Sequence, residues 1–144
     1  MAVPNTHEGP ARIGAVMDGV RSRGGSVYCI GIGGVMMASL AILTARAGFP
    51  VSGSDRAFAG RCDSPTAQRL TAAGIRLFGD HAAAHLPPDC GAVIYTVAIA
   101  EDNPEYRAAA ERGIPRFSRA DYIGWLMTGY NRRVGVAGMH GKST

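Results

Sequence analysis

The sequence predicts a single α/β domain, a Rossmann-like wound parallel sheet with flanking helices. Short apolar segments alternate along the chain with segments whose apolar residues recur at helical spacing. The helical segments open with capping residues and close at glycines, and the first apolar segment runs into a glycine-rich turn. A chain of 144 residues, 47% of them hydrophobic, is long enough for one compact core.

Two helices are expected on either side of the first strand, which we place at residues 26–30. The helix before this strand ends near Gly24, and its apolar face consists of Ile13, Val16, Met17 and Val20. The helix after it ends at Gly48, and its apolar face consists of Met36, Met37, Leu40, Leu43 and Ala47. Packing in the core is the expected role of these methionines.

Further strands are expected at residues 50–54, 75–78, 92–96, 114–117 and 133–137. Two of the intervening helices begin with a capping residue and a proline, Ser64-Pro65 and Asn103-Pro104. They close at Gly74 and Gly113, and Ser118 caps the next helix; that helix carries Tyr122, Ile123, Leu126 and Met127. Strands that alternate with helices form parallel sheets, which bind ligands at the carboxyl ends of their strands.

Composition argues against several classes of partner. The formal net charge of +4 is small and the arginines are scattered, so we expect no nucleic acid. No apolar run approaches the roughly 18 residues of a membrane span, so we expect no membrane contact. Cys29, Cys62 and Cys90 are far apart and form no C-x-x-C pair, which argues against zinc and favours a reducing cytoplasm.

The first glycine-rich turn has the features of a phosphate site. Gly31, Gly33 and Gly34 lie between an expected strand and an expected helix, where backbone amides can meet a pyrophosphate. Asp55 ends the next strand, where an acidic residue often contacts a ribose hydroxyl. Met36 occupies the place of the third glycine of the dinucleotide fingerprint, and a turn-capping role for Asp55 is an equal alternative.

The second glycine-rich turn resembles an ATP loop. An apolar run leads into Gly-Met-His-Gly-Lys-Ser-Thr at residues 138–144. We expect ATP to contact Gly138, Gly141, Lys142, Ser143 and Thr144. Lys142 is the only lysine of the sequence and would reach the terminal phosphates, and the Ser143 hydroxyl would ligate Mg²⁺. Because the helix of such a loop would follow Thr144, we expect this chain to be the leading part of a larger ATP-using enzyme.

Taken in order, these motifs resemble the Mur ligases of bacterial peptidoglycan synthesis. The similar stretches are residues 30–34, 51–55, 98–105, 113–115, 118–120 and 137–144, so the resemblance extends over residues 26–144. The Gly-Ile-Gly-Gly and Asn-Pro-Glu pieces favour the alanine-adding branch. Met36, Val97 and Met139 depart from the glycine, serine and threonine that the family often has there.

The resemblance implies an enzyme that joins UDP-N-acetylmuramate to L-alanine with ATP and Mg²⁺. Residues 1–25 would be a tail and short helix, residues 26–131 the UDP-binding domain, and residues 132–144 the start of the ATP-binding domain. It also implies substrate contacts for Thr96 and, less strongly, for His81 and Arg119. Lys142 and His140 would be catalytic, although a structural role for His140 is equally expected.

Three alternatives remain open at this stage. An NAD(P)-binding oxidoreductase domain could use Arg56, beside Asp55, to contact a 2′-phosphate, but it has no use for residues 138–144. A non-catalytic nucleotide-sugar-binding module is the second alternative. The third is a related ligase that recycles murein tripeptide. The oligomeric state is left unassigned.

Overall fold

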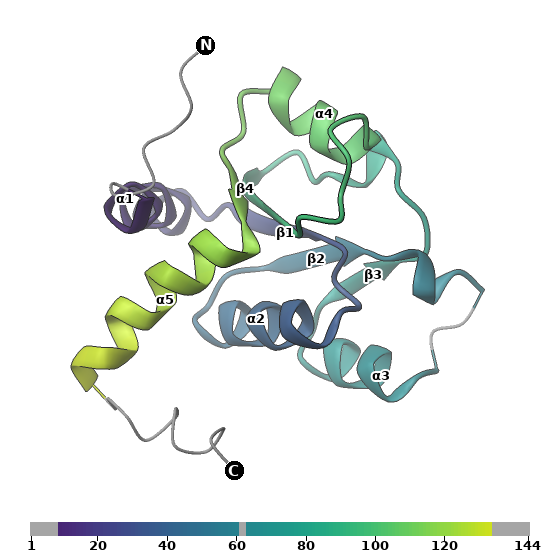
Figure 1. Ribbon diagram of the computed structural model, residues 1–144, viewed down its shortest axis with the longest axis horizontal. Helices are drawn as coiled ribbons and strands as arrows, with labels where there is room; N and C mark the ends of the chain where they lie inside the picture. Colours follow the sequence, from purple (N-terminus) through teal and green to yellow (C-terminus); the bar gives the residue numbers. More distant parts are fainter. Residues whose placement is uncertain (1–8, 61–62, 134–144) are drawn as a thin grey trace.

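The computed structural model describes residues 9–60 and 63–133. Within them, strands form one sheet in the order β3-β2-β1-β4-β5, and each neighbouring pair is parallel. The strands are β1 Ser26–Ile30, β2 Val51–Ser54, β3 Arg76–Phe78, β4 Cys90–Tyr95 and β5 Arg116–Ser118. The predicted Rossmann-like parallel sheet is confirmed (Figure 1).

Three of the helices begin where the sequence places their caps. The helices are α1 Gly9–Ser22, α2 Val35–Arg46, α3 Pro65–Ala72, α4 Pro104–Glu111 and α5 Arg119–Arg133, with 3-10 turns η2 Arg56–Phe58 and η3 Ala83–His85. Oγ of Ser64 accepts a hydrogen bond from an amide of α3, and Oγ of Ser118 accepts one from α5. Oδ1 of Asn103 accepts two from the first turn of α4. Local side-chain chemistry therefore fixes these three starts.

Helices cover both faces of the sheet. α1, α2, α3 and α5 pack on one face, whereas α4 and η3 lie on the other (Figure 1). The residues of β1 alternate between the two cores: Val27 and Cys29 belong to the first, and Tyr28 and Ile30 to the second. All residues of β1 are buried, because this strand lies at the centre of the sheet.

The first and last helices of the described chain pack against each other, as Figure 1 shows. Ile13 and Met17 of α1 share the larger core with Tyr122 of α5. A Cβ atom at Gly14 would lie 3.2 Å from Nε1 of Trp125, so the two helices approach closely at this point. The amino-terminal helix is therefore held in place by the carboxyl-terminal one.

Two expectations about elements were wrong in detail. Met36 is 50% exposed rather than packed in the core, because the buried face of α2 is centred on Met37, Ala41 and Thr44 and Met36 lies off that face. Arg133 ends α5 instead of starting a strand, and residues 134–137 of that expected strand lie outside the described residues. The division of the chain at residue 132 stays a prediction. Within the described ranges, each helix is too short or too polar to cross a bilayer.

Candidate functional site

The sheet order places a topological switch point between β1 and β4. The chain leaves β1 toward α2 on one face and leaves β4 toward α4 on the other. Ligands of wound parallel sheets bind at the carboxyl ends of the two strands where the connections diverge in this way. The predicted site residues Gly31 and Thr96 directly follow these two strand ends, and Asp55 follows the neighbouring end of β2.

Gly31 and Thr96 lie beside each other at the switch point. Gly31 has a φ of 85°, a conformation that strains residues with a Cβ atom. A Cβ atom there would lie 3.5 Å from Oγ1 of Thr96. The N–H groups of Gly31 and Ile32 both donate to the carbonyl of Ser54, at 2.8 and 3.0 Å. The turn is thereby anchored to the end of β2.

Asp55 bonds directly to the glycine turn. Its Oδ2 accepts a hydrogen bond from the N–H of Gly33 at 2.8 Å, and its Oδ1 accepts one from the N–H of Ala57 at 2.9 Å. The second bond caps η2, so the turn-capping role is present in the structure. The Gly33 amide is occupied by this bond rather than left free for an anion. A ribose contact of Asp55 stays a prediction.

The first turn of α2 offers amides that the sequence analysis did not single out. The N-cap residue is Gly34, which has no side chain to cap the helix, and the first turn contains no acidic residue. The N–H of Ala38 donates to Gly34, so the amides of residues 35–37 precede the first intrahelical bond. Together with the helix dipole, these amides favour an anion. Val35 and Met36 in this turn, and Val97 just after β4, are exposed apolar side chains at the same edge of the sheet.

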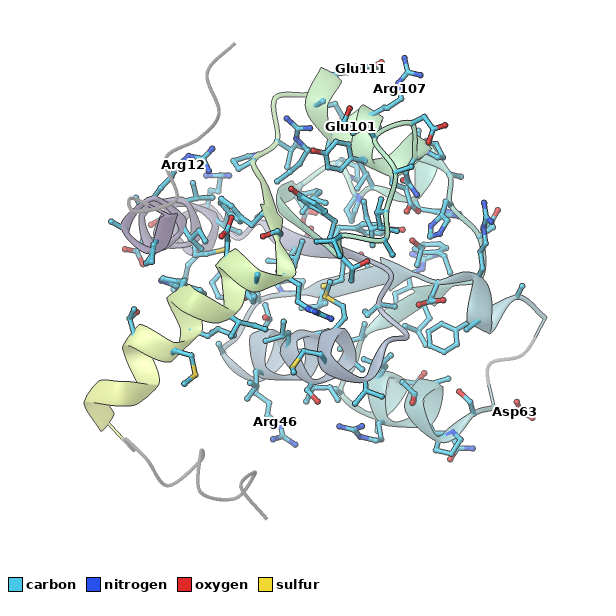
Figure 2. The ribbon with its side chains drawn as sticks, in the orientation of Figure 1. Arg12, Arg46, Asp63, Glu101, Arg107 and Glu111 are labelled. Atoms are coloured by element: carbon cyan, nitrogen blue, oxygen red, sulfur yellow. The ribbon has the colours of Figure 1, made fainter. Side chains whose placement is uncertain are left out.

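A buried polar cluster, formed by Tyr28, Ser54, His81 and Glu105, lies at the end of β2. Glu105 of α4 is fully buried, whereas Arg107 and Glu111 of the same helix point outward (Figure 2). The hydroxyls of Tyr28 and Ser54 each donate to the Glu105 carboxylate at 2.6 Å. Burial, and next the bond to Glu105, raise the pKa of Tyr28 well above its usual range.

His81, a predicted substrate contact, belongs to this cluster. Its Nδ1 lies 2.9 Å from Oγ of Ser54 and 3.1 Å from Oε1 of Glu105. Only 11% of the His81 side chain is exposed. The Asn-Pro-Glu motif in the sequence indicated that Glu105 lies in the first turn of a helix. Its burial could not be predicted in this way, because it depends on Tyr28 of β1 and Ser54 of β2, which lie far away in the chain.

Arg119 begins α5 directly after β5, at the same carboxyl edge of the sheet. The register pairs Tyr95 of β4 with Ser118 of β5, so Arg119 follows the strand end next to that of Thr96, and its substrate contact stays a prediction. The predicted ATP-loop residues lie outside the described residues: Gly138, His140, Gly141, Lys142, Ser143 and Thr144. Their roles, like those of Gly31, Gly33, Gly34, Asp55, Thr96 and His81, stay predictions.

Comparison with known proteins places this fold in a family. The model of the Mur ligase family, catalytic domain, matches residues 26–131. The UDP-N-acetylmuramate–L-alanine ligase of Lachnoclostridium phytofermentans is 42% identical over 118 residues, which are 82% of this chain and 24% of that protein. The protein of the same name from Streptomyces coelicolor is 45% identical over 117 residues, which are 81% of this chain and 24% of that protein.

Solved structures show the same similarity. A UDP-N-acetylmuramate–alanine ligase from Thermotoga maritima superposes with a TM-score of 0.59 at 26% identity, covering 75% of this chain and 23% of that one. A UDP-N-acetylmuramate:L-alanyl-γ-D-glutamyl-meso-diaminopimelate ligase from Neisseria meningitides superposes with a TM-score of 0.60 at 28% identity, covering 72% of this chain and 30% of that one. The chain thus spans only 24% of the length of the two curated relatives above. With residues 26–131 matched by the family model, the chain belongs to the Mur ligase family.

Proposed function

We propose that this chain is the UDP-N-acetylmuramate-binding part of an ATP-dependent ligase that adds L-alanine in peptidoglycan synthesis. The observation that carries the proposal is the start of α2, whose uncapped amides lie at the switch point beside the turn at Gly31. A pyrophosphate group would find donors and a favourable dipole there, with no acidic residue in the first turn of α2 to repel it.

The hydrogen bonds of Asp55 are compatible with a second role as a ribose contact. A carboxylate has about four lone-pair positions, and the bonds to Gly33 and Ala57 use one on each oxygen. A remaining lone pair could accept from a ribose hydroxyl. The Thr96 hydroxyl, adjacent to Gly31, would contact the substrate at the neighbouring strand end.

The proposed reaction begins when the muramyl carboxylate attacks the γ-phosphate of ATP, which yields an acyl phosphate and ADP. The amine of L-alanine then displaces phosphate and forms the amide. Positioning and charge neutralisation dominate such phosphoryl transfers. Lys142 would neutralise the terminal phosphates and Ser143 would hold Mg²⁺. The enzyme would work in the cytoplasm.

A ligase that recycles murein tripeptide is the second candidate. The Neisseria structure supports it, because its TM-score of 0.60 matches the 0.59 of the alanine ligase from Thermotoga. The two candidates share the UDP-sugar site and differ in the amine that they accept. Phosphate release by the complete enzyme, with L-alanine in one assay and the tripeptide in another, separates them.

Calorimetric titration of the chain with UDP-N-acetylmuramate, UDP and NADH tests the proposed ligand. We expect UDP-N-acetylmuramate to bind, UDP to bind more weakly, and NADH to bind least. Tighter binding of NADH would favour the oxidoreductase alternative and overturn the proposal. Binding of the UDP-sugar without any ligation by the complete enzyme would instead favour a non-catalytic module.

A further inference from the structure

The Glu105 carboxylate is surrounded by hydrogen-bond donors. Its Oε2 accepts from the Tyr28 hydroxyl at 2.6 Å and from the N–H of Ala82 at 3.3 Å. Its Oε1 accepts from the Ser54 hydroxyl at 2.6 Å and lies 3.1 Å from Nδ1 of His81. A carboxylate offers only lone pairs, so each of these neighbours must present a hydrogen.

This arrangement fixes which nitrogen of His81 carries the proton. The Ser54 hydroxyl has a single hydrogen, which it donates to Glu105. A bare Nδ1 would therefore place its lone pair against the carboxylate and would receive no hydrogen from Ser54. Nδ1 must be protonated, and in the neutral ring Nε2 is then a hydrogen-bond acceptor.

Nε2 is the nitrogen of His81 that remains for a ligand. Within residues 9–60 and 63–133 it has no hydrogen-bond partner, and it is not sealed from solvent. His81 bonds to Ser54, the last residue of β2, and Asp55 follows directly. The acceptor therefore lies at the same edge of the sheet as the proposed UDP-sugar site.

We propose that Glu105 is a positioning residue that holds His81 in its Nδ1–H form, so that Nε2 accepts a hydrogen bond from the ligand. The ligand group must be a donor, either a ribose hydroxyl or the N–H of a pyrimidine ring. A ring nitrogen without hydrogen at that place, as in cytosine, would meet Nε2 lone pair to lone pair. The inference has two halves. The ligand half, that Nε2 accepts a hydrogen bond from the ligand, rests on the proposed function. The protonation half, that Nδ1 of His81 carries the proton, does not.

The chain contains a matched control in the pair of His85 and Asp80. Here the carboxylate bonds the opposite ring nitrogen, with Oδ1 of Asp80 2.9 Å from Nε2 of His85. Asp80 is 76% exposed, unlike the buried Glu105. His85 should therefore carry its proton on Nε2, and two histidines of one chain should show opposite tautomers.

Glu105→Gln is the informative substitution because the donors around it constrain the new amide. The N–H of Ala82 can only donate, so it holds the amide oxygen in the place of Oε2. The amide nitrogen then faces Ser54 and His81. Nδ1 of His81 must become an acceptor, and its proton moves to Nε2.

The first test is ¹⁵N spectroscopy of the imidazole rings in the labelled 144-residue chain, at a pH where the rings are neutral. Loss of a signal in His81→Gln assigns His81. We expect Nδ1–H in the wild-type chain and Nε2–H in Glu105→Gln, with His81 unchanged in Asp80→Asn. An Nε2–H signal for wild-type His81 overturns the proposal, and this result does not require that Glu105→Gln folds.

The second test is calorimetric binding of UDP, CDP and 2′-deoxy-UDP. Glu105→Gln should weaken UDP binding about tenfold or more, whereas Asp80→Asn should leave it unchanged. If Nε2 bonds the pyrimidine N–H, CDP should bind the wild-type chain weakly; if Nε2 bonds the ribose 2′-hydroxyl, 2′-deoxy-UDP should bind weakly. The affinity of that analogue should not change in Glu105→Gln. Equal binding of UDP by wild type and Glu105→Gln overturns the ligand half. If UDP does not bind the wild-type chain, the proposed function fails, and the spectra alone judge the protonation half.

Discussion

The carboxylate of Asp55 and the backbone N–H of Gly33 are joined by a hydrogen bond of 2.8 Å. This bond ties the end of β2 to the turn that follows β1, so two residues expected to contact different parts of a ligand form one unit. The turn is therefore braced from the side of β2 before any ligand arrives, which lowers the ordering cost of binding.

Asp55→Ala should affect both stability and binding. Loss of the cap on η2 and of the bond to Gly33 should lower the free energy of unfolding by about 1 kcal/mol. UDP-sugar binding should weaken by about 1–3 kcal/mol if a buried ribose bond is also lost. Urea titration and calorimetry measure the two effects. Asp18→Ala, at an exposed position of α1, is the control and should change neither quantity. Unchanged affinity for the UDP-sugar in Asp55→Ala would restrict Asp55 to a structural role.

Gly31→Ala should destabilise the fold, whereas Gly34→Ala should be tolerated. Gly31 has a φ of 85°, where a Cβ atom costs roughly 1–2 kcal/mol. Gly34 has a φ of −69°, and a Cβ atom there meets nothing closer than 3.9 Å. Urea unfolding of the two variants measures the difference. Equal stability of both would show that the turn conformation at Gly31 does not limit stability.

Stability should fall at alkaline pH because buried groups keep their protons. Burial raises the pKa of Cys29 from 9.0 to about 12 and that of Cys90 from 9.0 to about 11. The unfolded thiols ionise first, so the free energy of unfolding should decline as pH rises from about 9 toward 12. Tyr28, whose pKa is also raised, contributes in the same direction.

Urea titrations across this range measure the alkaline effect. In a Cys62→Ser background, a thiol reagent at about pH 8 should react with Cys29 and Cys90 only as fast as the fold opens, because both are buried. Rapid reaction in the absence of urea would contradict the burial of these thiols.

Lys142→Ala in the complete ligase should abolish phosphate release while leaving UDP-sugar binding intact, because the two proposed sites use different loops. Lys142→Arg should also be severely impaired, since a guanidinium does not replace a compact ammonium at a phosphate. The 144-residue chain alone should neither hydrolyse ATP nor form the amide. Phosphate release with UDP-N-acetylmuramate and L-alanine measures all three, and turnover by the chain alone would show that the domain division is wrong.

The sequence predicted the features that local chemistry determines. Helix capping is one such feature, because a side-chain oxygen directly before a helix lies within reach of the free amides of its first turn. The caps at Ser64, Asn103 and Ser118 form in this way. The parallel sheet followed from the alternation of strand and helix patterns. The glycine turn after β1 lies at a carboxyl end of the sheet, as predicted, because it directly follows a strand. That this end is the switch point depends on the order of the strands in the sheet, which the sequence did not predict.

Long-range pairing could not be predicted in the same way. Glu105 lies in the first turn of a helix, where an acidic side chain usually faces solvent beside the dipole; its burial depends on Tyr28 and Ser54, on strands far away in the chain. The bond of Asp55 to Gly33 joins residues from two different turns. Met36 fits a helical apolar face by spacing, but the face of α2 that the sheet buries runs through Met37, Ala41 and Thr44 instead.

The packing of α1 against α5 has a consequence for how the domain is made. Among the described elements α1 is synthesised first, yet a main contact partner, α5, is synthesised last. The core around Ile13 and Met17 is therefore incomplete until Tyr122 and Trp125 have been synthesised. At roughly 5–20 residues per second, synthesis of the intervening residues takes about 5–20 seconds. The nascent domain is thus most vulnerable to aggregation and proteolysis during synthesis, and its folding is completed only when residues up to about 133 have emerged.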